Sequence, residues 1–168
     1  REYMMSQVFV SGHKSPDTDS IAAALSYSYL KRRLGMDAVA VRAGEINKES
    51  RFALDYFNLE EPILVTSVER KNPEDEKQKV ILVDHNESKQ TIDGMDDAEV
   101  LEIIDHHRFG DFESENPIFI LVRPVGCVNT VIYGLYKTNH IKPSREIAGI
   151  MLSAIISDTV LFRSPTTT

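Results

Sequence analysis

The stretch Val80-Ile81-Leu82-Val83-Asp84-His85-Asn86-Glu87 decides how the rest of this chain is interpreted. Its first four residues form an apolar, mostly β-branched run that is too short for a helix. The run therefore predicts a buried strand of a parallel sheet. Ligands of open α/β sheets bind beyond the carboxyl ends of the strands. Because the run stops at Asp84, this carboxylate is predicted to lie where such a sheet forms its site.

Three other apolar segments also end at acidic or imidazole side chains. The segments and the groups that follow them are Val8 to Val10 with His13, Asp17 and Asp19, Val100 to Ile104 with Asp105, His106 and His107, and the helical run Ile147 to Ile156 with Asp158. One such group follows each element. The sequence therefore predicts that the groups meet at one shared metal site.

Composition limits the classes of protein to consider. A chain of 168 residues is long enough for one domain with a hydrophobic core. The net charge of −7 argues against a nucleic-acid partner, although bound metal ions would still let a small anionic substrate approach. The single Cys127 excludes an intramolecular disulfide, and no apolar run is long enough for a membrane span. These features predict a cytoplasmic protein without a membrane partner.

Strand-like and helix-like segments alternate along the chain. The predicted strands cover residues 7–10, 37–42, 62–65, 80–83, 100–104 and 117–122, and the predicted helices cover 19 or 20 to about 34, 48–58, 127–139 and 144–157. Alternation of this kind predicts an α/β fold with a mostly parallel open sheet and helices on both faces. Residues 69–79 are highly charged and are expected to form a solvated surface loop.

The candidate ligands also admit simpler interpretations. Helix capping accounts for either Asp17 or Asp19, but it explains neither His13 nor two carboxylates one residue apart. Asp84 alone would pass as a turn residue. A carboxylate such as Asp158 at a helix C-terminus opposes the helix dipole, which indicates a compensating cation.

The block Asp105-His106-His107 is harder to explain without a site. If strand geometry continues, the two imidazoles point to opposite sides, so one can bind metal while the other faces a substrate. Asp105 can orient a ring nitrogen. Imidazole and carboxylate ligands without a thiolate suit manganese, cobalt or magnesium. Six side chains are too many for one open metal, but they fit two ions about 3.5–4 Å apart that share a carboxylate and attack phosphorus.

Four blocks of the sequence resemble the signature blocks of the family II (manganese-dependent) inorganic pyrophosphatases of the DHH phosphoesterase superfamily. They are Gly12-His13-Lys14-Ser15-Pro16-Asp17-Thr18-Asp19-Ser20, Val83-Asp84-His85-Asn86-Glu87, Asp105-His106-His107-Arg108 and Ser157-Asp158-Thr159-Val160-Leu161-Phe162-Arg163-Ser164-Pro165-Thr166. The third block alone indicates only the superfamily, and the second and fourth narrow the resemblance to the pyrophosphatases. The resemblance runs from about Gln7 to the last residue.

The resemblance implies a role for each site residue. One metal would be bound by His13, Asp17 and Asp84, and the other by Asp19, Asp84, His106 and Asp158, with Asp84 as the bridge. His107 would contact the substrate phosphate and, with Asp84, is the expected catalytic residue. His85 and Asp105 would support the ligands, and Gln90 is a candidate polar contact to substrate. The expected cofactors are two Mn²⁺ or Co²⁺ ions, with Mg²⁺ possible alongside the substrate.

The resemblance also implies a larger protein. The chain would be the catalytic DHH domain of a pyrophosphate hydrolase, without the C-terminal domain that supplies lysines and arginines to pyrophosphate. Residues 69–79 occupy the position where some members carry a regulatory insert of CBS modules. A homodimer is expected, with residues 118–122 as the edge strand that pairs. A DHH phosphodiesterase acting on short nucleotides is the alternative enzyme, although no basic, aromatic groove for bases is evident. A metal-binding fragment that is inert alone is the non-enzyme alternative.

Overall fold

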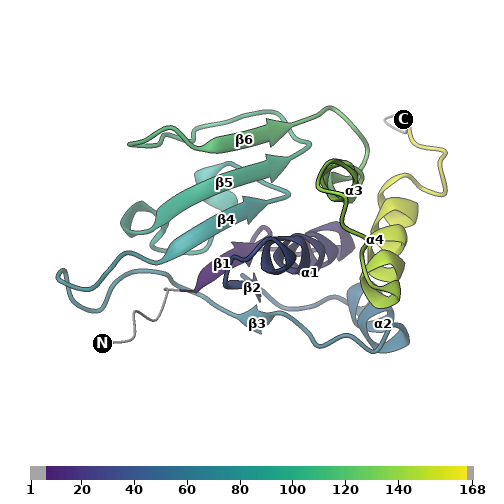
Figure 1. Ribbon diagram of the computed structural model, residues 1–168, viewed down its shortest axis with the longest axis horizontal. Helices are drawn as coiled ribbons and strands as arrows, with labels where there is room; N and C mark the ends of the chain where they lie inside the picture. The colour runs from purple at the N-terminus through teal and green to yellow at the C-terminus, as the bar shows by residue number, and fades with distance from the viewer. Residues whose placement is uncertain (1–6, 166–168) are drawn as a thin grey trace.

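The computed structural model describes residues 7–165, which form one six-stranded sheet with four α-helices. All strand pairs are parallel, and the strand order is β3-β2-β1-β4-β5-β6. The strands are β1 (Val8–Ser11), β2 (Ala38–Arg42), β3 (Ile63–Leu64), β4 (Lys79–Val83), β5 (Glu99–Asp105) and β6 (Phe119–Val122). Figure 1 shows β4, β5 and β6 side by side and running in the same direction. The predicted α/β class and parallel sheet are confirmed.

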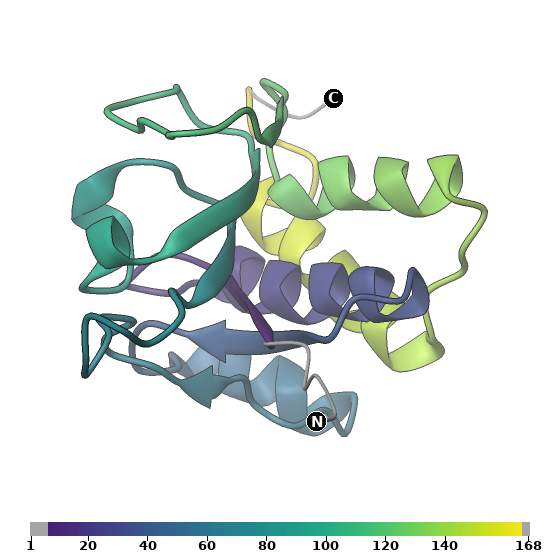
Figure 2. The same cartoon turned by 60° about the vertical axis from the view of Figure 1, so that its left-hand side comes forward.

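The two faces of the sheet are covered unequally. The α-helices are α1 (Thr18–Arg33), α2 (Lys48–Tyr56), α3 (Val128–Thr138) and α4 (Arg145–Asp158). Helices α1 and α3 pack on the strands, and α4 packs on α1 and α3 in the same hydrophobic cluster. Helix α2 packs on α1 and α4 in a second cluster. Both views show the helices gathered on one side of the sheet (Figures 1 and 2). The other face is covered by loops and the 3-10 helix η2 (Met95–Asp97). Helices were expected on both faces, but the second face carries only this short 3-10 helix within the described residues.

Strand β4 lies at the centre of this arrangement and is buried on both faces. Ile81 and Val83 pack toward the helices, whereas Val80 and Leu82 pack toward the opposite cluster. This alternation follows from the two-residue repeat of a strand. It explains why the run of β4 is apolar throughout rather than alternating with polar residues.

The direction of chain progression reverses between β1 and β4. The chain passes from β1 to β2 and β3 on one side, then returns to place β4, β5 and β6 on the other side. The carboxyl ends of two strands on either side of such a reversal border a crevice where ligands of open α/β sheets bind. The loop that carries His13 follows β1, and Asp84 follows β4. The topology therefore brings the first two sequence blocks together.

Several element boundaries differ from the expectation. Helix α1 begins at Thr18, and its cap is Asp17, whose carboxylate accepts a hydrogen bond from the backbone N–H of Ser20. The start expected at residue 19 or 20 lies inside the first turn, and of the two capping candidates Asp17 is the cap rather than Asp19. Residues 69–79 form a mostly exposed loop, as predicted, although the last of them opens β4. No helix within residues 7–165 combines the length and apolarity needed to cross a membrane.

Candidate metal centre

Asp84 is the first residue after β4, and its carboxylate is buried and held in place. Its backbone adopts φ 61°, a left-handed conformation that is uncommon outside glycine but that aspartate tolerates. The backbone N–H of Asp84 still donates to the carbonyl of Ile104 at 3.0 Å, which ties the turn to β5. The hydroxyl of Ser20 donates to Oδ2 of Asp84 at 2.8 Å. The turn therefore aims a fixed carboxylate away from the end of the strand.

Each oxygen of the Asp84 carboxylate faces a different imidazole. His13 Nε2 lies 3.4 Å from Oδ2, and His106 Nε2 lies 3.1 Å from Oδ1. Burial alone would raise the pKa of Asp84, but hydrogen bonds with His106, His13 and Ser20 hold it well below its usual range. Asp84 is therefore an anion with one oxygen facing each side of the centre.

The His13 side of the centre comes from the loop after β1. His13 Nε2 lies 3.6 Å from Oδ1 of Asp17, and the Asp17 side chain is 50% exposed. Burial would lower the pKa of His13, but hydrogen bonds to Asp17 and Asp84 raise it to about 10. In the absence of a cation this imidazole therefore carries a proton between two carboxylates, where a metal ion could take the place of the proton.

The His106 side is built around an oriented imidazole. His106 Nδ1 is 2.8 Å from the carbonyl of Val125. A carbonyl can only accept a hydrogen bond, so Nδ1 is the donor and Nε2 is the nitrogen that can bind a metal ion. Fixing one ring nitrogen on a carbonyl in this way is typical of metal-binding histidines. Nε2 faces Asp84 and also lies 3.6 Å from Oδ2 of Asp19. Burial would lower the pKa of His106, but Asp84 and the Val125 carbonyl raise it to about 9.

Two further carboxylates, Asp19 and Asp158, complete this side. Ligand atoms of Asp19, Cys127 and Asp158 all lie within 4.8 Å of one another. Burial and the neighbouring carboxylates Asp84 and Asp158 raise the pKa of Asp19. Burial, together with the charges of Asp17 and Asp84, raises the pKa of Asp158 to about 6. Closely spaced acids of this kind are costly without a cation, so the donor set fits a bound divalent ion.

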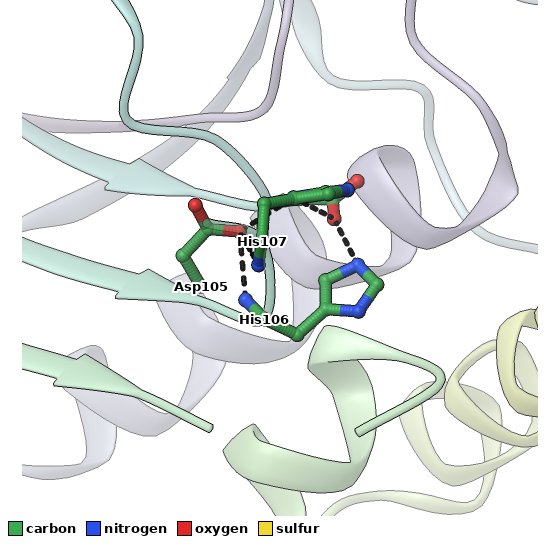
Figure 3. Close-up of side chains that lie close together, drawn as sticks. Asp105, His106 and His107 are labelled. Carbon is green, nitrogen blue, oxygen red and sulfur yellow. Dashed lines mark hydrogen bonds and ion pairs between the residues drawn. The ribbon is translucent and has the colours of Figure 1, made fainter. Parts of the chain in front are cut away.

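Asp105 holds His107 in place (Figure 3), and its carboxylate also lies within 4.8 Å of ligand atoms of Asp84, His106 and His107. Its Oδ1 accepts from His107 Nδ1 at 2.7 Å and from the backbone N–H groups of His106 and His107, and its Oδ2 accepts from Asn86 at 2.7 Å. The hydrogen bond to Asp105 raises the pKa of His107. The expectation that the two imidazoles point to opposite sides was wrong. Strand β5 ends at Asp105, and the ring centres lie 4.1 Å apart.

Two expected residues lie beside the centre. His85 is buried, with Nδ1 2.8 Å from the carbonyl of Val83, and its Nε2 has no hydrogen-bond partner within residues 7–165. Burial lowers the pKa of His85 to about 4. Gln90 is exposed in the 3-10 helix η1 (Ser88–Gln90). Its carbonyl accepts from the backbone N–H of Lys14, which joins η1 to the His13 loop, but its side chain makes no hydrogen bond to the cluster in the described part of the chain.

Sequence reasoning missed the side chains that hold the carboxylates. Ser20 donates to Asp84, Asn86 to Asp105, and Cys127 and Asn129 to Asp19. Asn86 stands inside the second quoted block and Cys127 outside all four, and nothing in their spacing indicates these partners. Asn129 lies outside every block. Its contact with Asp19 spans 110 positions, so only the fold brings the two together.

Residues 7–155 match the model of the DHH family, N-terminal domain. The chain belongs to the DHH family. Two relatives, from Exiguobacterium sp. and Bacillus licheniformis, are each named "Probable manganese-dependent inorganic pyrophosphatase". They are 51% and 52% identical to this chain over 164 residues, which make up 98% of the chain and 52% of each relative. This DHH chain therefore spans about half the length of the curated relatives that it matches.

The DHH fold is also found in a solved structure. A crystal structure from Methanococcus jannaschii, named as a candidate family II inorganic pyrophosphatase, superposes with a TM-score of 0.84 at 41% sequence identity. The match covers 96% of this chain and 51% of that one. The likeness agrees with the DHH family assignment, and this chain again spans about half of the chain that it matches.

Proposed function

We propose that this DHH chain is the metal-binding half of an inorganic pyrophosphatase, which hydrolyses pyrophosphate to two phosphates. The names of the two relatives and of the Methanococcus jannaschii structure support the substrate. In this proposal residues 69–79 are a surface loop of a single DHH domain, and a second domain supplies the cationic groups for pyrophosphate. We also propose a cytoplasmic location, because the free thiol of Cys127 suits a reducing compartment.

One observation carries the proposal, namely that the two oxygens of Asp84 face two different imidazoles, at 3.1 and 3.4 Å. A carboxylate divided in this way is suited to bridging two divalent ions. We propose that His13, Asp17 and Asp84 hold one ion, and that Asp19, Asp84, His106 and Asp158 hold the other. Imidazole ligands favour Mn²⁺ or Co²⁺ over Mg²⁺ at these positions, and Mg²⁺ can still accompany the substrate.

Two ions bound here would supply an activated water nucleophile and neutralise charge on the phosphoryl group. The chain's own residues would position the substrate and handle the proton. His107 is half-exposed, and Asp105 fixes its Nδ1, so Nε2 is the ring nitrogen that would meet a phosphate oxygen. Because Asp105 raises the pKa of His107, the ring can donate a hydrogen bond or proton to the leaving phosphate.

Two cations that follow histidines of this centre in sequence are already engaged. Lys14 forms an ion pair with Asp93, and Arg108 Nε donates to Glu87 at 3.0 Å. Neither is therefore free to clamp the leaving phosphate without first breaking a contact. Loss of one preorganised charge contact typically costs about 10²–10³ in rate, so we expect the isolated chain to be slow.

The test is phosphate release from pyrophosphate in Mn²⁺. It would compare this chain with a chimaera that appends the remaining half of the Bacillus licheniformis relative. We expect the chimaera to hydrolyse pyrophosphate and the isolated chain to be at least ~10³-fold slower. An isolated chain as fast as the chimaera would show that the clamp lies within these residues. A chimaera that cleaves a short dinucleotide but not pyrophosphate would favour the phosphodiesterase alternative.

We also propose that the protein is a homodimer formed through β6. Supporting this, β6 is one edge of the sheet, and its residues Phe119 and Ile120 are 48% and 42% exposed. The unpaired backbone groups of such an edge can pair with a second copy. Sedimentation velocity should detect a dimer of the native chain and a monomer of Ile120→Lys, since an edge lysine opposes strand pairing. A native chain that is monomeric at micromolar concentration would contradict the proposal.

A further inference from the structure

The two oxygens of the Asp19 carboxylate have different environments. Oδ1 accepts from the Cys127 thiol at 2.8 Å, from the Asn129 side-chain amide at 2.5 Å and from the Asn129 backbone N–H at 3.3 Å. Oδ2 accepts from the backbone N–H of Val128 at 2.8 Å and faces His106 Nε2 at 3.6 Å. The start of α3 therefore places three donors on Oδ1 and one on Oδ2, and Oδ2 is the oxygen that also faces the centre.

The side chain of Asn129 is itself fixed. It is fully buried, and its Oδ1 accepts from the hydroxyl of Ser26 at 3.0 Å. Its Nδ2 donates to both the side chain and the backbone carbonyl of Asp19, the latter at 3.1 Å. Turning the amide over would set its oxygen against a carboxylate that can only accept. Ser26 on α1 and Asn129 on α3 thus form a rigid support with a defined donor.

The hydrogen bonds to Asp19 offset the cost of burying its negative charge. Asp19 has no exposed surface, and Asp84 and Asp158 are close enough to oppose its negative charge. A buried anion needs hydrogen-bond donors to offset the loss of water. Donors that leave both oxygens partly free would also let the carboxylate rotate. Three donors on Oδ1 favour the ionised form and fix which oxygen remains available.

We propose that Asn129 and Cys127 are positioning residues that present Oδ2 of Asp19 to the metal ion on the His106 side. The inference rests on the proposed metal centre. It adds to that centre two residues that touch neither metal nor substrate and act only through Asp19. Partners of this kind, which orient a ligand from behind, typically contribute 10- to 100-fold to metal affinity.

The experiment is a Mn²⁺ titration of the purified chain by calorimetry, which requires no enzymatic activity. Asn129→Ala and Cys127→Ala should each weaken one of the two binding events by about 10- to 100-fold and leave the other nearly unchanged. Cys127→Ser keeps a donor of similar size and should recover most of the affinity lost in Cys127→Ala. Asn139→Ala is the matched control, because Asn139 caps the far end of the same helix and its side-chain amide donates to the carbonyl of Leu135 at 2.8 Å.

A second variant covers the case in which Asn129→Ala does not fold. Ser26→Ala removes the hydrogen bond that orients the amide, together with a longer one to the carbonyl of Ala23 in the same helix, so it should weaken the same binding event by about 2- to 10-fold. Circular dichroism of the metal-free variants checks that each is folded.

Equal Mn²⁺ affinities for the native chain, Cys127→Ala and Ser26→Ala would overturn the inference while leaving the proposed function intact. Equal weakening of both binding events, with no recovery in Cys127→Ser, would also overturn it, because that result indicates general loosening. A native chain that binds no Mn²⁺ would overturn the inference and the metal centre together.

Discussion

The two sides of Asp84 are built in different ways. On one side, His13 and Asp17 come from a single loop, and the Asp17 side chain is half-exposed. On the other side, Asp19, His106 and Asp158 come from three separate elements, and Asp19 is completely buried. The first turn of α3 holds Asp19 from behind, whereas the half-exposed Asp17 side chain caps α1 and contacts His13.

The difference shows how one centre can combine an open and a preorganised half. The His13 side exchanges readily with solvent, so water can replace a lost ligand there at moderate cost. On the His106 side, Asp19 has no access to water, and hydrogen bonds hold Asp19 and His106 in place before any ion arrives. A fixed site loses less freedom on binding. We therefore expect the His106 side to bind its ion more tightly and to tolerate substitution less.

Substitution of Asp84, the residue common to both sides, should have the largest effect on Mn²⁺ affinity. In Asp84→Asn the residue loses the negative charge that faces both imidazoles, so both binding events should weaken. Each should weaken by more than the roughly 10- to 100-fold that loss of a supporting partner costs. A Mn²⁺ titration checks this. One binding event left at native strength would show that Asp84 does not bridge and that the two sides are independent.

Matched substitutions on the two sides should have unequal effects. Asp19→Asn places an amide against the donors of Cys127, Val128 and Asn129, so it should weaken the His106-side event by about 100-fold. Asp17→Asn keeps the ability to cap α1, and water can reach its position, so we expect about 10-fold on the His13 side. Equal losses in the two titrations would contradict the contrast between a buried and an open half.

The pH dependence of stability and of Mn²⁺ affinity should be the smallest of these effects. Its sign follows from the pKa values of the two histidines. The pKa values of about 10 for His13 and about 9 for His106 lie above the usual value of 6.5. In the metal-free chain, each histidine therefore contributes stability that is fully present below pH 6.5 and is lost as pH rises through 9 to 10. Mn²⁺ must displace the same protons, so its affinity should rise by up to about tenfold per pH unit for each proton.

Urea unfolding of the metal-free chain and Mn²⁺ titration, both at several values between pH 7 and 10, measure the two trends. The free energy of unfolding should fall over this range while Mn²⁺ affinity rises. His140 is a control, because it lies just past the end of α3 and belongs to none of the ligand groups. His140→Ala should leave both profiles unchanged. A loss of Mn²⁺ affinity equal to that of His106→Ala would refute the ligand assignment.

The parts of the fold set by local pattern were predictable. The apolar run of β4 indicated a buried strand, and the alternation of elements indicated a parallel sheet with its site at the carboxyl ends. The edge position predicted for β6 is confirmed. The unequal cover of the two faces was not predictable, because it depends on which way each connection passes over the sheet.

The residues of the candidate site were predictable from local sequence pattern, but the directions of their side chains were not. The ligand residues stand out because polar groups interrupt apolar runs, and a parallel sheet brings the ends of those runs together. The directions of His106 and His107 depend on where the chain leaves β5, which residue types do not reveal. The supports of Asp19 lie more than 100 positions away in sequence, so only the packing of α1 against α3 identifies them.

The central claim is that two ions share Asp84, and anomalous diffraction tests it most directly. Crystals of this chain grown with Mn²⁺ would be measured at the manganese absorption edge. We predict two anomalous peaks about 3.5–4 Å apart on either side of the Asp84 carboxylate, one beside His13 and one beside His106. A single peak, or a peak between Asp105 and His107 with none beside His13, would contradict the shared carboxylate and the proposed centre.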